Sequence, residues 1–144
     1  MNQPNDENYI IDLCDSILNS FGSRQHRFDF LRGDPGKRRQ GIRLPVDAYY
    51  ADLKLVIEYR ERQHSEAVTF FDNPDKLTVS GVSRGEQRAK YDQRRRDVLK
   101  RNGIRLVELS FDDFEYNSSK RLVRTTVKDL QILRAKLTEA KIIG

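Results

Sequence analysis

Two acidic residues inside an apolar stretch are the residues of this sequence best suited to chemistry. Residues 43–64 read RLPVDAYYADLKLVIEYRERQH, with Asp47 and Glu58 on either side of a turn expected near Ala51 and Asp52. Side chains along a β-strand alternate between two faces, so such a hairpin places both carboxylates on one side of a sheet. Because neighbouring carboxylates repel each other unless a proton or a cation relieves them, the pair predicts a metal site.

Magnesium suits this pair of side chains. Mg²⁺ takes hard oxygen ligands, and proteins often bind it through one or two carboxylates together with water and phosphate. An ion held by Asp47 and Glu58 can activate a water molecule and offset the charge that develops on a scissile phosphate. The pair therefore indicates cleavage of a phosphate ester.

Two further residues of the same stretch could assist. Arg60 lies two positions after Glu58 on the same face and can stabilise charge on a phosphate. It is a poor general base, because a guanidinium does not lose its proton at working pH. His64 can transfer a proton near neutral pH.

A downstream helix carries charged residues on one face. Asp92, Arg95 and Leu99 share a face of the helix expected over residues 86–102. If Leu99 faces the core, Asp92 and Arg95 point toward the sheet and toward the hairpin.

Each of these residues also has a plainer explanation. Asp47 and Glu58 fit solvent-facing positions of a half-exposed hairpin, and a single histidine such as His64 is more often a surface residue than a catalyst. Asp92 and Arg95 fit a surface ion pair worth only about 0.3–0.5 kcal/mol. A functional site is favoured because all of these residues occur together, at spacings that allow the hairpin residues and the helix residues to face one another.

The rest of the chain supplies the elements that would position these residues. Apolar spacing and turn residues predict a mixed sheet with flanking helices, which is an α/β fold. We expect a helix over 8–21, strands over 25–31, 42–48, 53–60 and 103–111, an irregular segment over 65–85, and helices over 86–102 and 119–142. We treat residues 1–144 as one domain, with a core over about 8–111 and the C-terminal helix packed beside it.

The first and last helices are predicted to be amphipathic. Glu7, Asp12 and Asp15 are expected to be solvated, although one of them could reach a nearby site. The apolar stripes comprise Ile10, Leu13, Cys14, Ile17, Leu18 and Phe21 in the first helix, and Leu122, Val123, Val127, Leu130, Leu133 and Leu137 in the last.

Composition narrows the class of protein. The chain has 27 lysine and arginine residues against 22 acidic ones, and the positive charge is concentrated in residues 36–43, 83–96 and 120–124, as expected for a nucleic-acid partner. No apolar run approaches the roughly 20 residues that a membrane span needs, and the first residues do not resemble a secretory signal. We expect a soluble cytoplasmic protein with no membrane contact.

The hairpin resembles the active-site motif of the PD-(D/E)XK nuclease superfamily. In PVDAYYADLKLVIEYRERQH, Pro45 and Asp47 match its P-x-D opening and Glu58 matches its second acid. Arg60 occupies the position of the motif's lysine, and His64 falls where many members place a histidine. The likeness is greatest to the compact branch that includes very short patch repair (Vsr-like) endonucleases.

The likeness continues in YDQRRRDVLKRNGIRLVELSF, where Asp92 and Arg95 match a helix signature before Gly103 and an apolar strand. The resemblance implies a restriction-endonuclease-like fold and a Mg²⁺-dependent DNA endonuclease, with Mn²⁺ as a substitute ion. It implies that Asp47 and Glu58 hold the metal, helped by the Tyr59 carbonyl.

The resemblance also implies roles for the other residues. Double-stranded DNA is the expected substrate, a homodimer is possible, and the biological role is restriction, defence or DNA repair. The catalytic set is Asp47, Glu58, Arg60, His64 and Asp92. The DNA-binding set is Arg38, Arg39, Arg84, Arg94, Arg95 and Arg96, with base contacts expected from the 65–85 segment.

Two other classes of protein remain open from the sequence. Arg60 in place of lysine favours a catalytically inactive DNA-binding or partner-dependent subunit with the same fold. An interaction domain that uses its C-terminal helix as a dimer face is the third.

Overall fold

The computed structural model describes residues 5–36, 40–61 and 81–144. Within them the chain forms the predicted α/β fold, a mixed four-stranded sheet with three α-helices. The elements are α1 (Asp6–Leu18), β1 (Ser23–Arg32), β2 (Arg43–Tyr50), the 3₁₀ turn η1 (Ala51–Leu53), β3 (Leu55–Arg60), α3 (Arg84–Arg101), β4 (Arg105–Ser110), the 3₁₀ turn η2 (Phe111–Asp113) and α4 (Thr126–Glu139).

The sheet has the strand order β1-β2-β3-β4. β1 and β2 are antiparallel, and so are β2 and β3. β3 and β4 are parallel and pair from Leu55 with Arg105 to Arg60 with Ser110. A parallel pair needs a long crossover, which α3 supplies.

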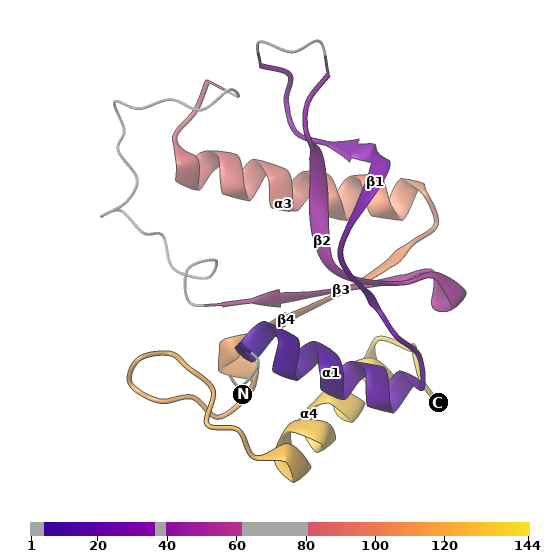
Figure 1. Cartoon of the computed structure of the whole chain (residues 1–144), viewed down its shortest axis with the longest axis vertical. Coiled ribbons are helices and arrows are strands. Elements are labelled where there is room, and N and C mark those ends of the chain that lie inside the picture. Colours follow the sequence, from indigo (N-terminus) through magenta and orange to yellow (C-terminus); the bar gives the residue numbers. More distant parts are fainter. Residues whose placement is uncertain (1–4, 37–39, 62–80) are drawn as a thin grey trace.

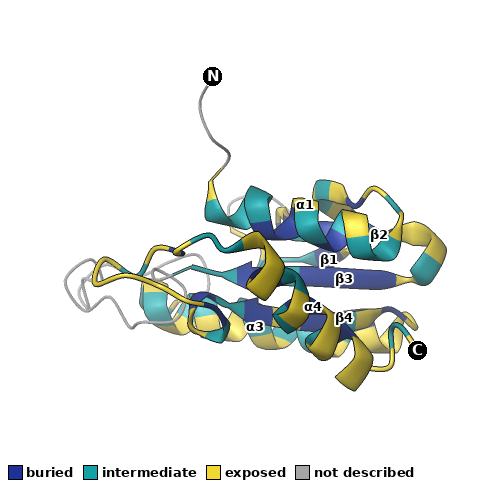
Figure 2. Cartoon of the chain, turned by 90° about the horizontal axis from the view of Figure 1, so that it is seen from below, coloured by how far each residue is buried: buried dark blue, intermediate teal, exposed yellow. Residues whose placement is uncertain are grey.

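Helices cover both faces of the sheet (Figure 1). α3 lies on one face, where Leu99 packs with Val56 of β3 and Ile104. α1 and α4 lie on the other face, where Ile10 and Leu133 belong to a cluster that includes Ile57. β3 lies between these layers (Figure 2), and its residues 55–57 and Tyr59 are buried. The side chain of Glu58 among them is therefore largely shielded from solvent.

The first helix is shorter than its apolar pattern predicts. It ends at Leu18, and Asn19 adopts the left-handed conformation that closes a helix. Phe21 therefore leaves the stripe and is 93% exposed. Asp15, expected to be solvated, instead accepts hydrogen bonds from the Tyr50 hydroxyl (2.6 Å) and the Gly22 amide (3.0 Å).

The last helix begins at Thr126 rather than near residue 119. Before it, the chain turns at residues 118–120, and an isolated bridge joins Tyr116 to Leu122 across this turn. Val123 and Val127, which the pattern assigned to the buried stripe, are exposed, whereas Asp129 is 1% exposed. The predicted stripe is therefore wrong at Val123 and Val127 and right at Leu122, Leu133 and Leu137, which are buried.

The helix expected over 86–102 forms as α3 and begins slightly earlier. Ser83 caps its start by accepting a hydrogen bond from the Glu86 amide, and Gly103 ends it with a positive φ of 70°. The predicted irregular segment lies outside the described residues from 65 to 80. No α-helix in the described ranges is long and apolar enough to cross a membrane.

Candidate active site

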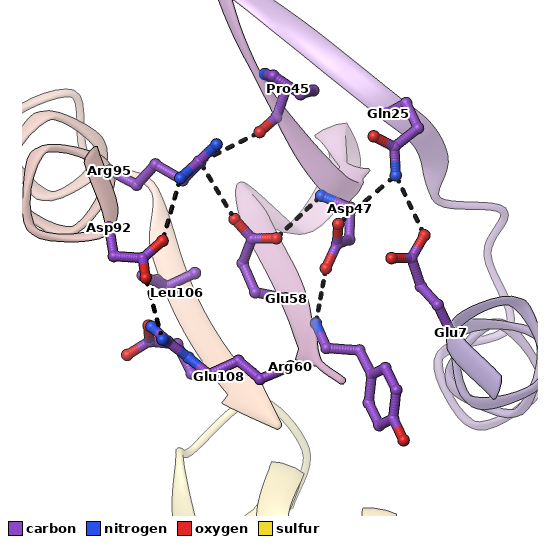
Figure 3. A pocket seen from close by; sticks show the side chains of 11 residues that line it. Glu7, Gln25, Pro45, Asp47, Glu58, Arg60, Asp92, Arg95, Leu106 and Glu108 are labelled. Atoms are coloured by element: carbon purple, nitrogen blue, oxygen red, sulfur yellow. Dashed lines mark hydrogen bonds and ion pairs between the residues drawn. The ribbon is translucent and has the colours of Figure 1, made fainter. Parts of the chain in front are cut away.

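Asp47 and Glu58 meet on adjacent strands. Ala48 pairs with Ile57 in the antiparallel ladder, and one step farther the Asp47 amide donates to Glu58 Oε2 (3.1 Å). The Tyr59 amide donates to Asp47 Oδ2 at 2.7 Å. Both carboxylates line a pocket of about 210 Å³, which residues of both α3 and α1 also line (Figure 3). We call it the candidate pocket.

The Glu58 side chain is largely removed from solvent, with 15% of it exposed. Burial and the neighbouring Asp47 carboxylate raise the pKa of Glu58 to about 9. In the protein alone, the pair therefore holds a proton near neutral pH, and a cation between the carboxylates would replace it.

A third carboxyl group, from Glu7 of α1, lines the same pocket. Gln25 of β1 connects it to the pair, because its Nε2 donates to Glu7 Oε2 at 3.1 Å and lies 3.5 Å from Asp47 Oδ1. Burial and the Asp47 charge raise the pKa of Glu7 to about 7. Glu7 is thus the member of the first helix's acidic residues that reaches the site.

Asp92 and Arg95 point from α3 into the pocket, as predicted from the face they share with the buried Leu99. The Arg95 Nε donates to the Pro45 carbonyl (3.1 Å) and lies 3.5 Å from Glu58 Oε1. Its Nη1 pairs with Asp92 Oδ1 at 3.1 Å. Arg95 therefore ties α3 to both strands of the hairpin.

Arg60 lies between two carboxylates. It pairs with Asp92 at 3.1 Å and also with Glu108 of β4. Burial works against the charge, but Glu108 and Asp92 raise the pKa of Arg60. Glu108 also accepts from Arg96 (3.0 Å), and these two guanidinium groups lower its pKa against the effect of burial.

Three polar pocket residues were not singled out as site residues from the sequence: Glu7, Gln25 and Glu108. Glu7 is three residues before Ile10 and seven before Cys14, which places it on the extended buried stripe of α1 and was a usable signal. Glu108 pairs with Glu58 in the parallel ladder, and its alternation with buried neighbours could have placed it on the α3 face. No sequence pattern singles out Gln25.

The other predicted residues are placed less closely to the pocket or not at all. Arg38, Arg39 and His64 lie outside the described residues. Arg84 is exposed at the start of α3. Arg94 pairs with Asp34 at 2.6 Å and donates to the Arg32 carbonyl at 3.0 Å, so it holds the segment after β1 against α3.

The donors in the pocket can be compared with what a metal ion needs. In residues 5–36, 40–61 and 81–144, no group of three or more histidine, cysteine, aspartate and glutamate side chains could hold a metal ion. Asp47 and Glu58 supply two carboxylates that repel each other. They fit Mg²⁺, which keeps several water ligands and commonly uses only one or two carboxylates.

Comparisons of the chain with models of protein families, with curated proteins and with solved structures found no match. The likeness to nucleases therefore depends on the motif residues and on the pocket they form.

Proposed function

We propose that this protein is a Mg²⁺-dependent DNA endonuclease with a restriction-endonuclease-like fold, similar to the PD-(D/E)XK nucleases. The observation that carries the proposal is the meeting of the Asp47 and Glu58 carboxylates on adjacent strands, within a pocket that Asp92 and Arg95 also enter. The mixed sheet with helices on both faces is compatible with such a fold.

The charge of the pocket supports a role for a cation. Of its eleven lining residues five are acidic and two are arginines; the acidic ones are Glu7, Asp47, Glu58, Asp92 and Glu108. This excess of negative charge repels a phosphodiester, whose own charge is negative. A divalent cation between Asp47 and Glu58 removes that repulsion and allows a phosphate to approach.

Asp47 and Glu58 would hold the ion. The backbone carbonyl of Tyr59, the residue after Glu58 in β3, would be a third oxygen ligand. When bound, the metal supplies an activated water and an electrostatic partner for the phosphate. The Tyr59 and Asp47 amides orient the carboxylates, as outer hydrogen bonds commonly do around metal ligands.

The surrounding residues would bind and orient the substrate. Arg60 and Arg95 present positive charge beside the pair, where it can stabilise the negative charge of the transition state. Asp92 fixes both guanidinium groups and is a candidate, with His64, for positioning the water or transferring its proton.

A groove along the outer edge of β4 gives a path for the DNA backbone. It has a volume of about 600 Å³ and shares Leu106 and Glu108 with the candidate pocket. Its charged residues are the cations Arg96, Lys100 and Arg105, with Glu108 as the acid. A groove with excess positive charge that shares two lining residues with the pocket suits a phosphate backbone.

The biological setting that we propose is restriction, defence or DNA repair in the cytoplasm. Cleavage of both strands at a symmetric site would require two pockets and hence a symmetric dimer.

Cleavage of DNA tests the proposal directly. Supercoiled plasmid is incubated with the purified protein and Mg²⁺ or Mn²⁺, and separately with EDTA. Nicked or linear DNA should form with either ion and not with EDTA. If wild-type protein cuts neither plasmid nor short duplexes with either ion, the proposed enzyme activity is wrong.

The contacts of Arg60 favour one alternative function. Because Asp92 and Glu108 both hold its guanidinium, Arg60 is less available to a phosphate than an unpaired cation would be, and unlike a lysine it cannot act as a general base. A DNA-binding subunit without activity predicts duplex binding that is independent of metal and strongly dependent on salt, with no cleavage.

A further inference from the structure

Gln25 has an unusual backbone for a residue inside a strand. Its φ is +49°, in the left-handed region where glycine is at ease and a residue with a Cβ is not. The residues on either side keep the ladder: Arg24 pairs with Ala48, and His26 pairs with Val46. The distortion is therefore confined to the position that lies across from Asp47.

Packing does not account for this conformation. The Gln25 side chain is exposed at the rim of the candidate pocket, so no enclosed core holds it in place. What its position achieves is contact with the pocket: Figure 3 shows its amide between Glu7 and Asp47, with Nε2 at 3.1 Å and 3.5 Å from their carboxylates.

The chemistry of the amide suits a site that must keep its negative charge. A glutamine donates hydrogen bonds from both hydrogens of one nitrogen and carries no charge. It can fix Glu7 relative to Asp47 without neutralising either of them. A lysine or arginine at the same place would compete with a cation for these carboxylates.

We propose that Gln25 is a positioning residue for the metal site, which orients the Asp47 carboxylate through hydrogen bonding and ties Glu7 to it. The left-handed backbone is kept because it aims this side chain into the pocket. Strained backbone of this kind is found where the surroundings or the function require it. The inference depends on the proposed function, since it assigns Gln25 to the cation site of that enzyme.

A glycine substitution separates this role from a structural one. Gln25→Gly suits the left-handed backbone but removes the amide, so it should unfold at an equal or higher urea concentration than wild type. Its affinity for Mn²⁺, measured by electron paramagnetic resonance in the absence of DNA, should fall about 10–100-fold, as for other hydrogen-bond partners of metal ligands. A purely structural residue would not give this combination.

Two other variants complete the experiment. Lys54→Gly relieves another left-handed residue (φ +46°) in the turn before β3, outside the pocket, and should leave the Mn²⁺ affinity unchanged. Gln25→Asn tolerates the left-handed backbone but has a shorter side chain, so its Mn²⁺ affinity should fall as in the glycine variant.

The outcomes distinguish this inference from the proposed function. If wild-type protein binds no Mn²⁺, the cation site fails and the role of Gln25 fails with it. If wild type binds Mn²⁺ and Gln25→Gly binds it equally well, the role of Gln25 alone is overturned. A Gln25→Gly variant that unfolds at lower urea than wild type would overturn the claim that function maintains the strained backbone.

Discussion

Glu58 is the residue whose surroundings give the strongest support to the proposed cation site. It is buried beside Asp47, and these two facts raise its pKa to about 9. Arg95 is near but lies 3.5 Å away and is shared with Asp92 and a backbone carbonyl. A carboxyl group in this setting is neutral in the protein alone and ionised when a cation is bound, so protons and metal ions compete for it.

The pH dependence of stability follows from this pKa. The unfolded chain releases the Glu58 proton near the ordinary value of 4.5, whereas the folded protein keeps it until about 9. The folded state therefore binds more protons across this window, and the contribution of Glu58 to the free energy of unfolding falls as pH rises, by up to about 1.4 kcal/mol per pH unit. Urea unfolding in EDTA should show a shallower fall between pH 5 and 8.5 in Glu58→Gln than in wild type.

The exposed Glu139→Gln on α4 is the control for this measurement and should follow wild type. Equal pH slopes for Glu58→Gln and wild type would contradict the assignment of the raised pKa to the Asp47–Glu58 pair.

Pocket residues could be predicted from the sequence where side chains follow the regular repeat of a strand or a helix. Alternation along the hairpin placed Asp47 beside Glu58, and helical spacing from Leu99 aimed Asp92 and Arg95 at the sheet. Gln25 could not be predicted, because the sequence does not give the register between β1 and β2 that places residue 25 across from Asp47.

At the scale of elements, α1 and α4 are joined by polar contacts as well as by their apolar stripes. The buried Asp129 of α4 accepts a hydrogen bond from the Tyr9 hydroxyl at 2.5 Å. At the neighbouring turn Arg124 pairs with Asp6 at 3.1 Å and stacks over the Tyr9 ring. Because α1 also carries Glu7, these contacts help to position one wall of the candidate pocket.

Removal of the Tyr9 hydroxyl tests this connection. Tyr9→Phe keeps the ring but removes one of two donors to the buried Asp129 carboxylate; among the residues that the structure describes, the Thr125 amide is the donor that remains. We expect a loss of about 1–3 kcal/mol in the free energy of unfolding, measured by urea denaturation. Tyr116→Phe, at a tyrosine that is 42% exposed, should change stability by less than about 0.5 kcal/mol. Equal effects would show that the buried hydrogen bond does not join the two helices.

The order and type of the elements could be predicted, but their ends could not. Helical spacing continues through Phe21 and begins again near Leu122, although neither residue is in a helix. The ends depend on local contacts: Asn19 closes α1 in a left-handed conformation, and Asp6 of α1 accepts from the Leu122 amide. A contact between residues so far apart in the chain cannot be predicted from the spacing of apolar residues within one segment.

At the scale of the whole molecule, acidic and basic side chains gather in two different, neighbouring places. The candidate pocket gathers acidic side chains from α1, α3 and the strands, and the groove at the β4 edge gathers Arg96, Lys100 and Arg105 beside it. For the proposed nuclease this arrangement separates the place that binds the cation from the place that binds the DNA backbone.

A lysine in the groove gives a quantitative test. Lys100→Ala should weaken binding to a DNA duplex, measured by fluorescence anisotropy in EDTA over a series of salt concentrations. If Lys100 neutralises one phosphate, the slope of log affinity against log salt should become shallower by about 0.9. Arg134→Ala removes an exposed charge from α4 and should leave the slope as in wild type. If the two variants have the same slope, the groove does not carry the DNA.

The most direct measurement is the rate of DNA cleavage by Asp47→Ala under single-turnover conditions with saturating Mg²⁺. Asp52→Ala, at an exposed aspartate in the turn of the same hairpin, is the matched control, and urea unfolding of both variants verifies the fold. We predict that Asp47→Ala cleaves at least about 100-fold more slowly than wild type, a larger effect than loss of an outer hydrogen bond, while Asp52→Ala cleaves at the wild-type rate. A folded Asp47→Ala variant that cuts DNA as fast as wild type would contradict the assignment of this pair as the centre of the proposed nuclease.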